Sequence, residues 1–276
     1  MRIVHLSDLH FGHHDDSVVQ SMEAEITAQK PDLVVVSGDF TQIGSRAEFA
    51  KAREFLDTLP APFMAVPGNH DVPERNLIRR FFNPYSCYRR YISRDLEPFV
   101  VRDGVALAGL KTSRRANWRG LNWADGAISQ EQLEQLEARF AQVPPETVKV
   151  VVAHHPLLLP EGPMGKQQNR VRRADKALAT FARIGVRLVL SGHFHMSYVR
   201  KHEHIGEVRV SEPVGPRESA AGHILVAQAA STTSTRLRGE PNAYNLIDIE
   251  NDEITIRVRE WGGGGWATRE KAQEPA

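Results

Sequence analysis

Five short apolar runs, each followed at once by polar residues, constrain the fold of this chain more than any other feature. The polar residues that follow the runs are Asp8 and His10, Asp39, Asn69 and His70, His154, and His193 and His195. Buried apolar runs of this kind are typical of the central strands of a sheet that is covered on both faces. Because the far ends of such strands lie at one edge of the sheet, we expect the polar residues to meet at one point.

The run at residues 63–66 shows this pattern in its most compact form. A Pro-Gly pair follows the run and makes the chain turn. Asn69, His70 and Asp71 come directly afterwards, so that an amide oxygen, an imidazole and a carboxylate stand side by side at the end of a predicted strand.

Length, charge and cysteine content narrow the class of protein. The 276 residues fit one large α/β domain, and the formal net charge of +1 does not imply a general surface for nucleic acid. Cys87 is the only cysteine, so no internal disulfide can form, which suits a reducing compartment. Charge occurs too early in residues 1–8 for a signal peptide, and no apolar run approaches the length of a membrane span. We expect a cytoplasmic protein, and the sequence leaves open peripheral membrane contact and a homo-oligomer.

The first two thirds of the chain are predicted to alternate between strands and helices. The predicted elements are 2–7, 15–29, 33–37, 46–59, 63–66, 149–153, 172–184 and 187–190. This alternation favours parallel strands. Asp103-Gly104 lies between two apolar stretches and predicts a hairpin, while Ser129, with Gln132 three residues later, predicts the start of a helix.

After residue 190 the pattern changes to short strands separated by turns. These strands are predicted at 197–203, 207–211, 223–227, 243–249 and 253–260, the last two forming an antiparallel hairpin. The segment between Trp261 and Trp266 contains four consecutive glycines and is expected to be flexible. We predict a single domain over residues 1–267, with a cap-like insert at about 74–126, and a flexible tail at 268–276.

The polar residues at the strand ends combine carboxylate, imidazole and amide groups without a thiolate. This set suits Mn²⁺, Fe²⁺/Fe³⁺, Zn²⁺ or Co²⁺ better than a soft metal ion. It contains more ligands than one ion needs if positions are to stay open for chemistry. Two divalent ions that share one carboxylate are the economical arrangement, and pairs of ions about 4 Å apart recur in phosphatases and nucleases.

Five motifs of this chain resemble those of calcineurin-like metallophosphoesterases and occur in the family's order. They are Asp8-Leu9-His10, Gly38-Asp39, Gly68-Asn69-His70-Asp71, His154-His155-Pro156 and Gly192-His193-Phe194-His195. The chain is most similar to the bacterial branch of cyclic-nucleotide phosphodiesterases and glycerophosphodiesterases, through its opening segment 5–11 and through residues 242–245. The resemblance implies a four-layer αββα sandwich, in which two mixed β-sheets lie face to face with helices outside.

The resemblance also implies a role for each residue of the motifs. Asp8, His10 and His195 would hold one ion, Asn69, His154 and His193 would hold the other, and Asp39 would bridge the two. His70 would face the substrate as a general acid or electrostatic stabiliser, with Asp71 as the carboxylate that compensates its charge. The implied reaction is hydrolysis of small phosphodiesters, such as a cyclic nucleotide or a glycerophosphodiester, by a hydroxide that bridges two divalent ions.

Contacts with the substrate are predicted for residues near the strand ends. His13 follows the first motif, and Arg114, Arg115 and Trp118 follow a strand whose end should approach the site. Arg suits an additional phosphate oxygen and Trp can stack on a base, whereas the alternative for all four is an ordinary surface loop. Residues 231–238 form either a further loop on the substrate side or a simple turn.

Other functions remain as alternatives. A UDP-diacylglucosamine-type pyrophosphate hydrolase would use the Arg- and aromatic-rich stretch 79–94, together with Trp261 and Trp266, at a membrane surface. That stretch is otherwise an amphipathic helix with a solvated Arg face. A phosphomonoesterase would use the same metal centre, and a nuclease would need a broad basic groove that the balanced charge does not support. A non-catalytic binding module on this fold would lack some ligands, and here none is missing.

Overall fold

The computed structural model describes residues 1–115, 124–161, 168–202, 223–250 and 253–269, so the predicted strand 207–211 and Trp118 lie outside the described residues. Its strands are β1 (Arg2–Leu6), β2 (Leu33–Val36), β3 (Phe63–Ala65), β4 (Phe99–Arg102), β5 (Val105–Leu110), β6 (Val148–Ala153), β7 (Val186–Ser191), β8 (Tyr198–His202), β9 (Ile224–Gln228), β10 (Ala243–Glu250), β11 (Glu253–Trp261) and β12 (Trp266–Thr268). Its helices are α1 (Asp16–Gln29), α2 (Arg46–Asp57), α3 (Leu77–Phe82), α4 (Ser86–Tyr91), α5 (Gln130–Phe140) and α6 (Ala174–Arg183). In these ranges no helix has the length and apolar character needed to cross a membrane.

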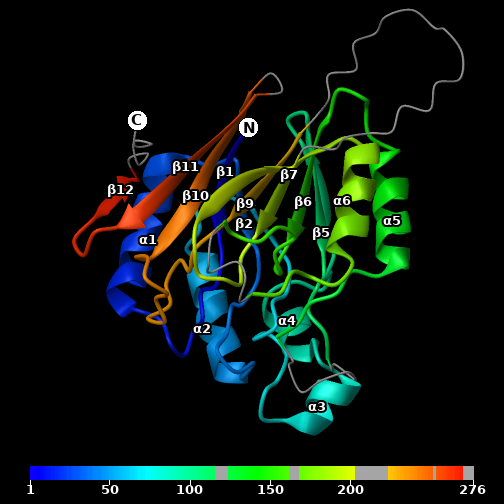
Figure 1. Ribbon diagram of the computed structural model, residues 1–276. Coiled ribbons are helices and arrows are strands. Elements are labelled where there is room, and N and C mark those ends of the chain that lie inside the picture. The colour runs from blue at the N-terminus through cyan, green and yellow to red at the C-terminus, as the bar shows by residue number, and fades with distance from the viewer. Residues whose placement is uncertain (116–123, 162–167, 203–222, 251–252, 270–276) are drawn as a thin grey trace, which may run out of the picture.

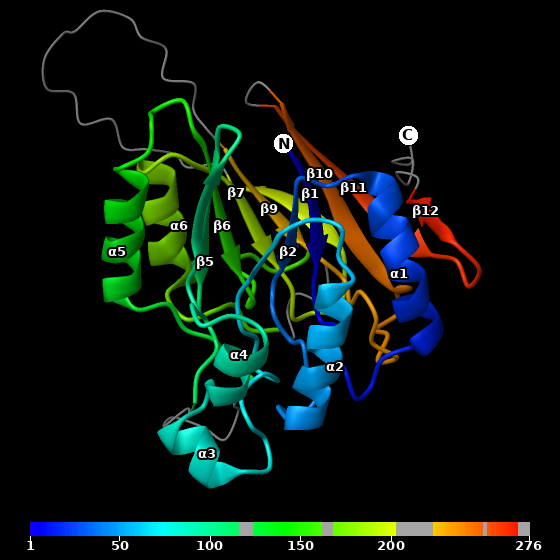
Figure 2. The same cartoon turned by 180° about the vertical axis from the view of Figure 1, so that it is seen from behind.

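Two six-stranded sheets form the centre of the molecule. Their strand orders are β12-β11-β10-β1-β2-β3 and β4-β5-β6-β7-β9-β8. In the first sheet β1, β2 and β3 are parallel, and in the second β5, β6, β7 and β9 are parallel, while antiparallel strands flank both sets. Helices α1 and α2 cover the outer face of the first sheet, and α5 and α6 cover that of the second (Figures 1 and 2). The expected αββα sandwich of two mixed sheets is therefore confirmed.

Three hydrophobic layers hold the sandwich together. One lies between the first sheet and α1 and α2, one lies between the second sheet and α5 and α6, and the third lies between the two sheets. Neighbouring residues of β1 enter different layers, since Val4 belongs to the layer beneath the helices and Ile3 to the layer between the sheets. Successive side chains of a strand point to opposite faces, so a strand buried on both faces must be apolar throughout.

The helix that begins after Ser129 starts as the sequence predicts. Ser129 Oγ accepts a hydrogen bond from the Gln132 N–H at 3.1 Å, and the Gln132 side chain accepts one from the Ser129 N–H at 2.7 Å. Two N–H groups that the helix leaves unpaired are thereby satisfied. The start of α5 and the β4–β5 hairpin predicted at Asp103-Gly104 are both confirmed.

The predicted cap-like insert at about 74–126 is only partly separate from the sandwich. Strands β4 and β5 belong to the second sheet. Helices α3 and α4 lie below the sheets, and α3 forms the tip of the molecule in both views (Figures 1 and 2).

The segment around the four glycines differs from the expectation of flexibility. Trp261 and Trp266 face each other across the antiparallel pair β11–β12, and the Trp266 indole N–H donates to Ser21 Oγ at 2.8 Å. Arg269 follows β12 and forms an ion pair with Glu240 at 2.8 Å, so ordered structure extends past the predicted boundary at residue 267. The contacts of Trp266 with α1 and with Trp261 accompany a hairpin that the glycine content alone does not predict.

Candidate metal centre

The ends of five parallel strands meet at one edge of the sandwich and bring the predicted ligands together. Asp8, Asp39 and Asn69 follow β1, β2 and β3 of the first sheet, while His154 and His193 follow β6 and β7 of the second. Backbone hydrogen bonds join neighbouring loops, for example from the Asp8 N–H to the Gly38 carbonyl at 3.0 Å. The convergence follows from topology, because parallel strands place their carboxyl ends at the same edge.

The backbone of these loops is strained at the predicted ligands themselves. Five of them have positive φ angles, namely Asp8 (51°), His10 (49°), Asp39 (56°), His193 (81°) and His195 (56°). A non-glycine residue in this left-handed region costs roughly 1–2 kcal/mol. Strain of this kind persists where surrounding structure imposes it, and it clusters at functional sites.

One group of side chains consists of Asp8, His10 and His195. Asp8 Oδ1 lies 3.3 Å from His195 Nε2 and 3.6 Å from His10 Nε2, and the two Nε2 atoms are 3.2 Å apart. His195 Nδ1 donates to the Arg236 carbonyl at 3.0 Å, which leaves a lone pair on Nε2 when the ring is neutral. Asp8 Oδ1 is buried and has no hydrogen-bond partner among the described residues.

A second group consists of Asn69, His154 and His193. Asn69 Oδ1 lies 3.1 Å from His154 Nε2 and 3.0 Å from His193 Nδ1. His154 Nδ1 donates to the Ser37 carbonyl at 2.7 Å, so its Nε2 is the nitrogen that faces the group.

Asp39 lies between the two groups. Its Oδ2 is 3.2 Å from His154 Nε2 and 3.8 Å from His10 Nε2, while its Oδ1 accepts the His70 N–H at 2.8 Å. A Cβ at Gly68 would overlap this carboxylate, so glycine is required there. One carboxylate therefore faces both ligand groups.

The donor set fits two divalent cations. Lone-pair atoms face one another in both groups, an arrangement that is repulsive unless a cation or a proton lies among them. Burial alone would raise the pKa of Asp8, but the charges of the nearby His195 and His154 hold it well below its ordinary value. Burial lowers the pKa of His154, yet the Asp39 carboxylate outweighs this effect and raises it to about 9. Without metal, a proton on His154 occupies the position that a cation would take.

His70 and Asp71 occupy different positions from those expected of a pair. His70 lines the cavity, and its Nδ1 donates to the Gln42 carbonyl at 2.6 Å. The Asp71 carboxylate instead accepts the backbone N–H groups of Gly68, Asp39 and Thr41 at 2.8, 3.0 and 3.1 Å. Burial and the neighbouring Asp39 raise the pKa of Asp71 to about 7. Asp71 thus organises the loops around Asp39, and the expected compensation of His70 by Asp71 is not seen.

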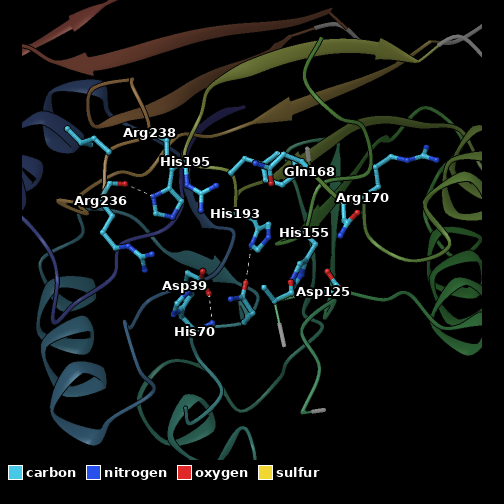
Figure 3. A pocket seen from close by; sticks show the side chains of 16 residues that line it. Asp39, His70, Asp125, His155, Gln168, Arg170, His193, His195, Arg236 and Arg238 are labelled. Carbon is cyan, nitrogen blue, oxygen red and sulfur yellow. Dashed lines mark hydrogen bonds between the residues drawn. The ribbon is translucent and has the colours of Figure 1, made fainter. Parts of the chain in front are cut away.

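A cavity of about 570 Å³ opens beside the two groups (Figure 3). Asp39, Asn69, His70, His193 and His195 line it. His155, which follows the ligand His154, also lines it, but its Nε2 donates to the Ala124 carbonyl and its Nδ1 lies 2.7 Å from Thr112 Oγ1. Both nitrogens of His155 are therefore used within the protein.

The predicted substrate contacts at His13, Arg114 and Arg115 are not found among the described residues that line the cavity. The His13 side chain bonds to Thr235, and the Arg115 guanidinium donates to the Phe81 carbonyl at 3.3 Å. Arg114 lines a separate hollow together with Ser129 and Arg172. The side chains of His13 and Arg115 are thus held by contacts outside the cavity.

Other polar residues line the cavity instead. Arg236 and Arg238 do so, which favours the substrate-side alternative for the loop 231–238. Asp125, Gln168, Asn169 and Arg170 also line it and were not predicted as site residues. The only sequence feature that could have indicated the last three is a run of polar residues in the loop after the fourth motif.

The fold and the site combine candidate metal ligands at the ends of parallel strands with a polar cavity beside them. The calcineurin-like phosphoesterase family matches residues 1–197, and the chain belongs to this family. All five motifs of the chain lie within the matched residues.

Named relatives include bacterial phosphodiesterases. The chain is 29% identical over 168 residues to a protein of Arcobacter nitrofigilis named "Probable glycerophosphodiester phosphodiesterase", and this match covers 60% of the chain and 57% of that protein. It is 27% identical over 221 residues to the 3′,5′-cyclic adenosine monophosphate phosphodiesterase of Escherichia coli K12, covering 71% of the chain and 70% of that protein. A dimetal phosphatase from Danio rerio shares the fold at 12% identity, with a TM-score of 0.65 over 94% of the chain and 96% of that structure.

Proposed function

We propose that the protein is a dinuclear metal-dependent phosphodiesterase that acts on small phosphodiesters, such as a cyclic nucleotide or a glycerophosphodiester. The observation that carries the proposal is the position of Asp39, whose Oδ2 faces His154 of one ligand group and His10 of the other. The names of the two bacterial relatives support a diester as the substrate.

In this proposal each ligand group holds one ion. Asp8, His10 and His195 would hold the first, Asn69, His154 and His193 the second, and Asp39 would bridge them. Mn²⁺, Fe²⁺/Fe³⁺, Zn²⁺ and Co²⁺ all suit these ligands. When bound, such ions lower the pKa of coordinated water and neutralise charge on the phosphate.

His70 would act on the substrate itself. The Gln42 carbonyl keeps a proton on its Nδ1, so Nε2 is the nitrogen that can exchange a proton with the substrate. From its position in the cavity lining, Nε2 would protonate the leaving alkoxide or stabilise charge on the phosphate oxygens.

The test compares rates on bis(p-nitrophenyl) phosphate and p-nitrophenyl phosphate after metal removal and reloading with Mn²⁺. A strong preference for the diester would support a phosphodiesterase, and a panel of cyclic and glycerol diesters would then identify the substrate. A preference for the monoester would contradict the proposal and indicate a phosphomonoesterase.

A second candidate is a pyrophosphate hydrolase that acts on a lipid-linked nucleotide at a membrane surface, and α3 is the observation that favours it. This helix buries Arg80, whose guanidinium donates to the Arg115 carbonyl at 2.9 Å, and exposes Ile78 (76%) and Phe82 (86%). Apolar side chains that are exposed together, as on this helix at the tip of the molecule, are typical of an interaction site, whereas single exposed apolar residues are ordinary.

Sedimentation with vesicles that contain phosphatidylglycerol tests this second candidate. The double variant Ile78→Ser, Phe82→Ser should lose binding if α3 inserts into the lipid. Val101→Ser, Val199→Ser is the matched control, because these two valines are also exposed but lie on β4 and β8. If the wild type stays in the supernatant, the membrane candidate is wrong.

A further inference from the structure

The walls of the cavity differ in charge. Arg236 and Arg238 belong to the wall formed by the loop between β9 and β10, whereas Asp125 lies on the opposite side from Arg236 (Figure 3). Both Arg side chains are exposed. A ligand in the cavity therefore meets the positive charge of these two side chains on one side.

Arg236 and Arg238 are available to a ligand in a way that Arg170 is not. Arg170 Nη1 and Nη2 donate to the two carboxylate oxygens of Asp175 at 2.7 and 2.9 Å. Within the described ranges, the guanidinium groups of Arg236 and Arg238 make no hydrogen bond or ion pair. Among the described residues, no acidic side chain therefore forms an ion pair with either of these two guanidinium groups at the cavity.

The loop that carries Arg236 is held rigidly against the metal centre. Ser231 Oγ donates to the Asp8 carbonyl at 2.7 Å, and Thr233 Oγ1 donates to the Leu9 carbonyl at 2.6 Å. The carbonyl of Arg236 accepts the Nδ1 proton of His195, while its side chain extends toward the part of the cavity near Asp39 and His70 (Figure 3). The backbone of Arg236 is therefore ordered before a ligand arrives, which lowers the entropy cost of binding.

We infer that Arg236 and Arg238 form an anion subsite, at which the substrate places a second negatively charged group in addition to the phosphodiester. The two ligand groups already provide for the single charge of a phosphodiester, and Arg binds phosphate or carboxylate through paired N–H donors. The inference rests on the proposed phosphodiesterase function and narrows its substrates to diesters that also carry a phosphate or a carboxylate.

A matched pair of substrates tests the subsite. The p-nitrophenyl ester of thymidine 5′-phosphate and its 3′-phosphorylated form have the same reacting group and differ only in a second anion. For the Mn²⁺-loaded wild type we expect a KM about 10- to 100-fold lower for the 3′-phosphorylated ester, because charge-assisted hydrogen bonds to the second phosphate would stabilise its complex by a factor of this size. In the double variant Arg236→Gln, Arg238→Gln this ratio should fall to about one. Arg102→Gln, an exposed Arg on β4, should keep the wild-type ratio.

Binding of products gives a second measurement that does not require turnover. Calorimetry on the Mn²⁺-loaded protein compares thymidine 3′,5′-bisphosphate with thymidine 5′-phosphate, and the bisphosphate should bind more tightly only when both Arg residues are present. Equal binding of the two products by the wild type, or a preference that survives in the double variant, would overturn the subsite. Failure to hydrolyse either ester would instead contradict the proposed function, and the calorimetric comparison would still decide the subsite.

Discussion

Backbone carbonyls determine which nitrogen of each imidazole is available at the site. Ser37, Gln42 and Arg236 accept the Nδ1 protons of His154, His70 and His195. In the neutral ring the remaining Nε2 then carries the lone pair and faces the cluster. These contacts orient the rings before any ion binds, as hydrogen bonds around metal ligands generally do.

Replacement of Asp39 tests whether one carboxylate serves both ligand groups. Asp39→Asn keeps the shape of the side chain but removes the negative charge that faces His10 and His154. We expect the variant to retain at most one tightly bound ion per chain and to lose about 1,000-fold or more in kcat, comparable to the loss when the aspartate of a catalytic triad is replaced by Asn. Metal analysis after dialysis and the rate on bis(p-nitrophenyl) phosphate measure both effects. Asp103→Asn in the exposed β4–β5 turn is the control, and an unchanged Asp39→Asn enzyme would refute the bridging role.

Replacement of His70 separates catalysis from metal binding. His70→Gln removes the proton-exchanging Nε2, so kcat should fall about 100- to 10,000-fold, as for loss of a general acid. Metal content should stay at the wild-type level, because His70 belongs to neither proposed ligand group. Loss of both ions in this variant would show that His70 is a ligand.

Metal affinity should rise with pH. The pKa of His154 is raised to about 9, mainly because Asp39 outweighs the effect of burial, and the pKa of His195 is also raised. Below these values an ion must displace a proton, so the Kd for Mn²⁺ should fall about tenfold per pH unit and per displaced proton. His193, with a pKa lowered by burial to about 3, is already neutral and adds nothing to this slope. Calorimetric titrations at pH 6, 7 and 8 measure the slope, and an affinity independent of pH would contradict it.

At the scale of elements, the sequence predicts those strands and hairpins whose positions follow from the apolar runs and from the alternation of strands and helices. The parallel strands β1, β2 and β3 and the β10–β11 hairpin follow from such patterns, and the structure confirms them. The positions of the metal-ligand candidates follow from the strand ends, because topology places those ends together. The sequence could therefore indicate the cluster before any coordinates were known.

Contacts between distant segments were not predictable in the same way. Arg114 follows a strand of the second sheet but lines another hollow, whereas Arg236 reaches the cavity because its loop is bonded to Asp8 and Leu9. The β11–β12 hairpin depends on Trp266 bonding to Ser21 of α1. Each of these features rests on side chains far apart in the sequence, which local patterns do not report.

The loop after β7 packs closely against the start of the first motif and leaves no room for a side chain at Gly192. A Cβ there would overlap the Ser7 hydroxyl, which follows β1 of the other sheet. Gly192→Ala should therefore lower the free energy of unfolding by about 1–3 kcal/mol, as overpacking does. Denaturation in urea measures the change. Gly264→Ala is the matched control, since a Cβ at this exposed turn would contact nothing within 4 Å. Equal stability of the two variants would contradict the close packing at Gly192.

At the scale of the whole molecule, the metal centre joins the two sheets of the sandwich. Asp8, His10, Asp39 and Asn69 come from loops of the first sheet, and the remaining candidates, His154, His193 and His195, come from the second. Beyond the apolar layer between the sheets, these side chains form polar contacts across the interface. Ions bound at this position would hold both halves together at the open edge.

Mn²⁺ should therefore stabilise the folded protein as a whole. An ion that binds only the folded state at 100 times its Kd adds about 2.7 kcal/mol to the free energy of unfolding. For a chain of this length that corresponds to a rise in Tm of roughly 5–10 °C. Thermal unfolding of the metal-free protein with increasing Mn²⁺ measures the rise, which Asp39→Asn should largely abolish and Asp103→Asn should retain. If Tm stays constant while the ions bind, the ligand loops of the two sheets are not coupled to global unfolding, and the centre stabilises only its own loops.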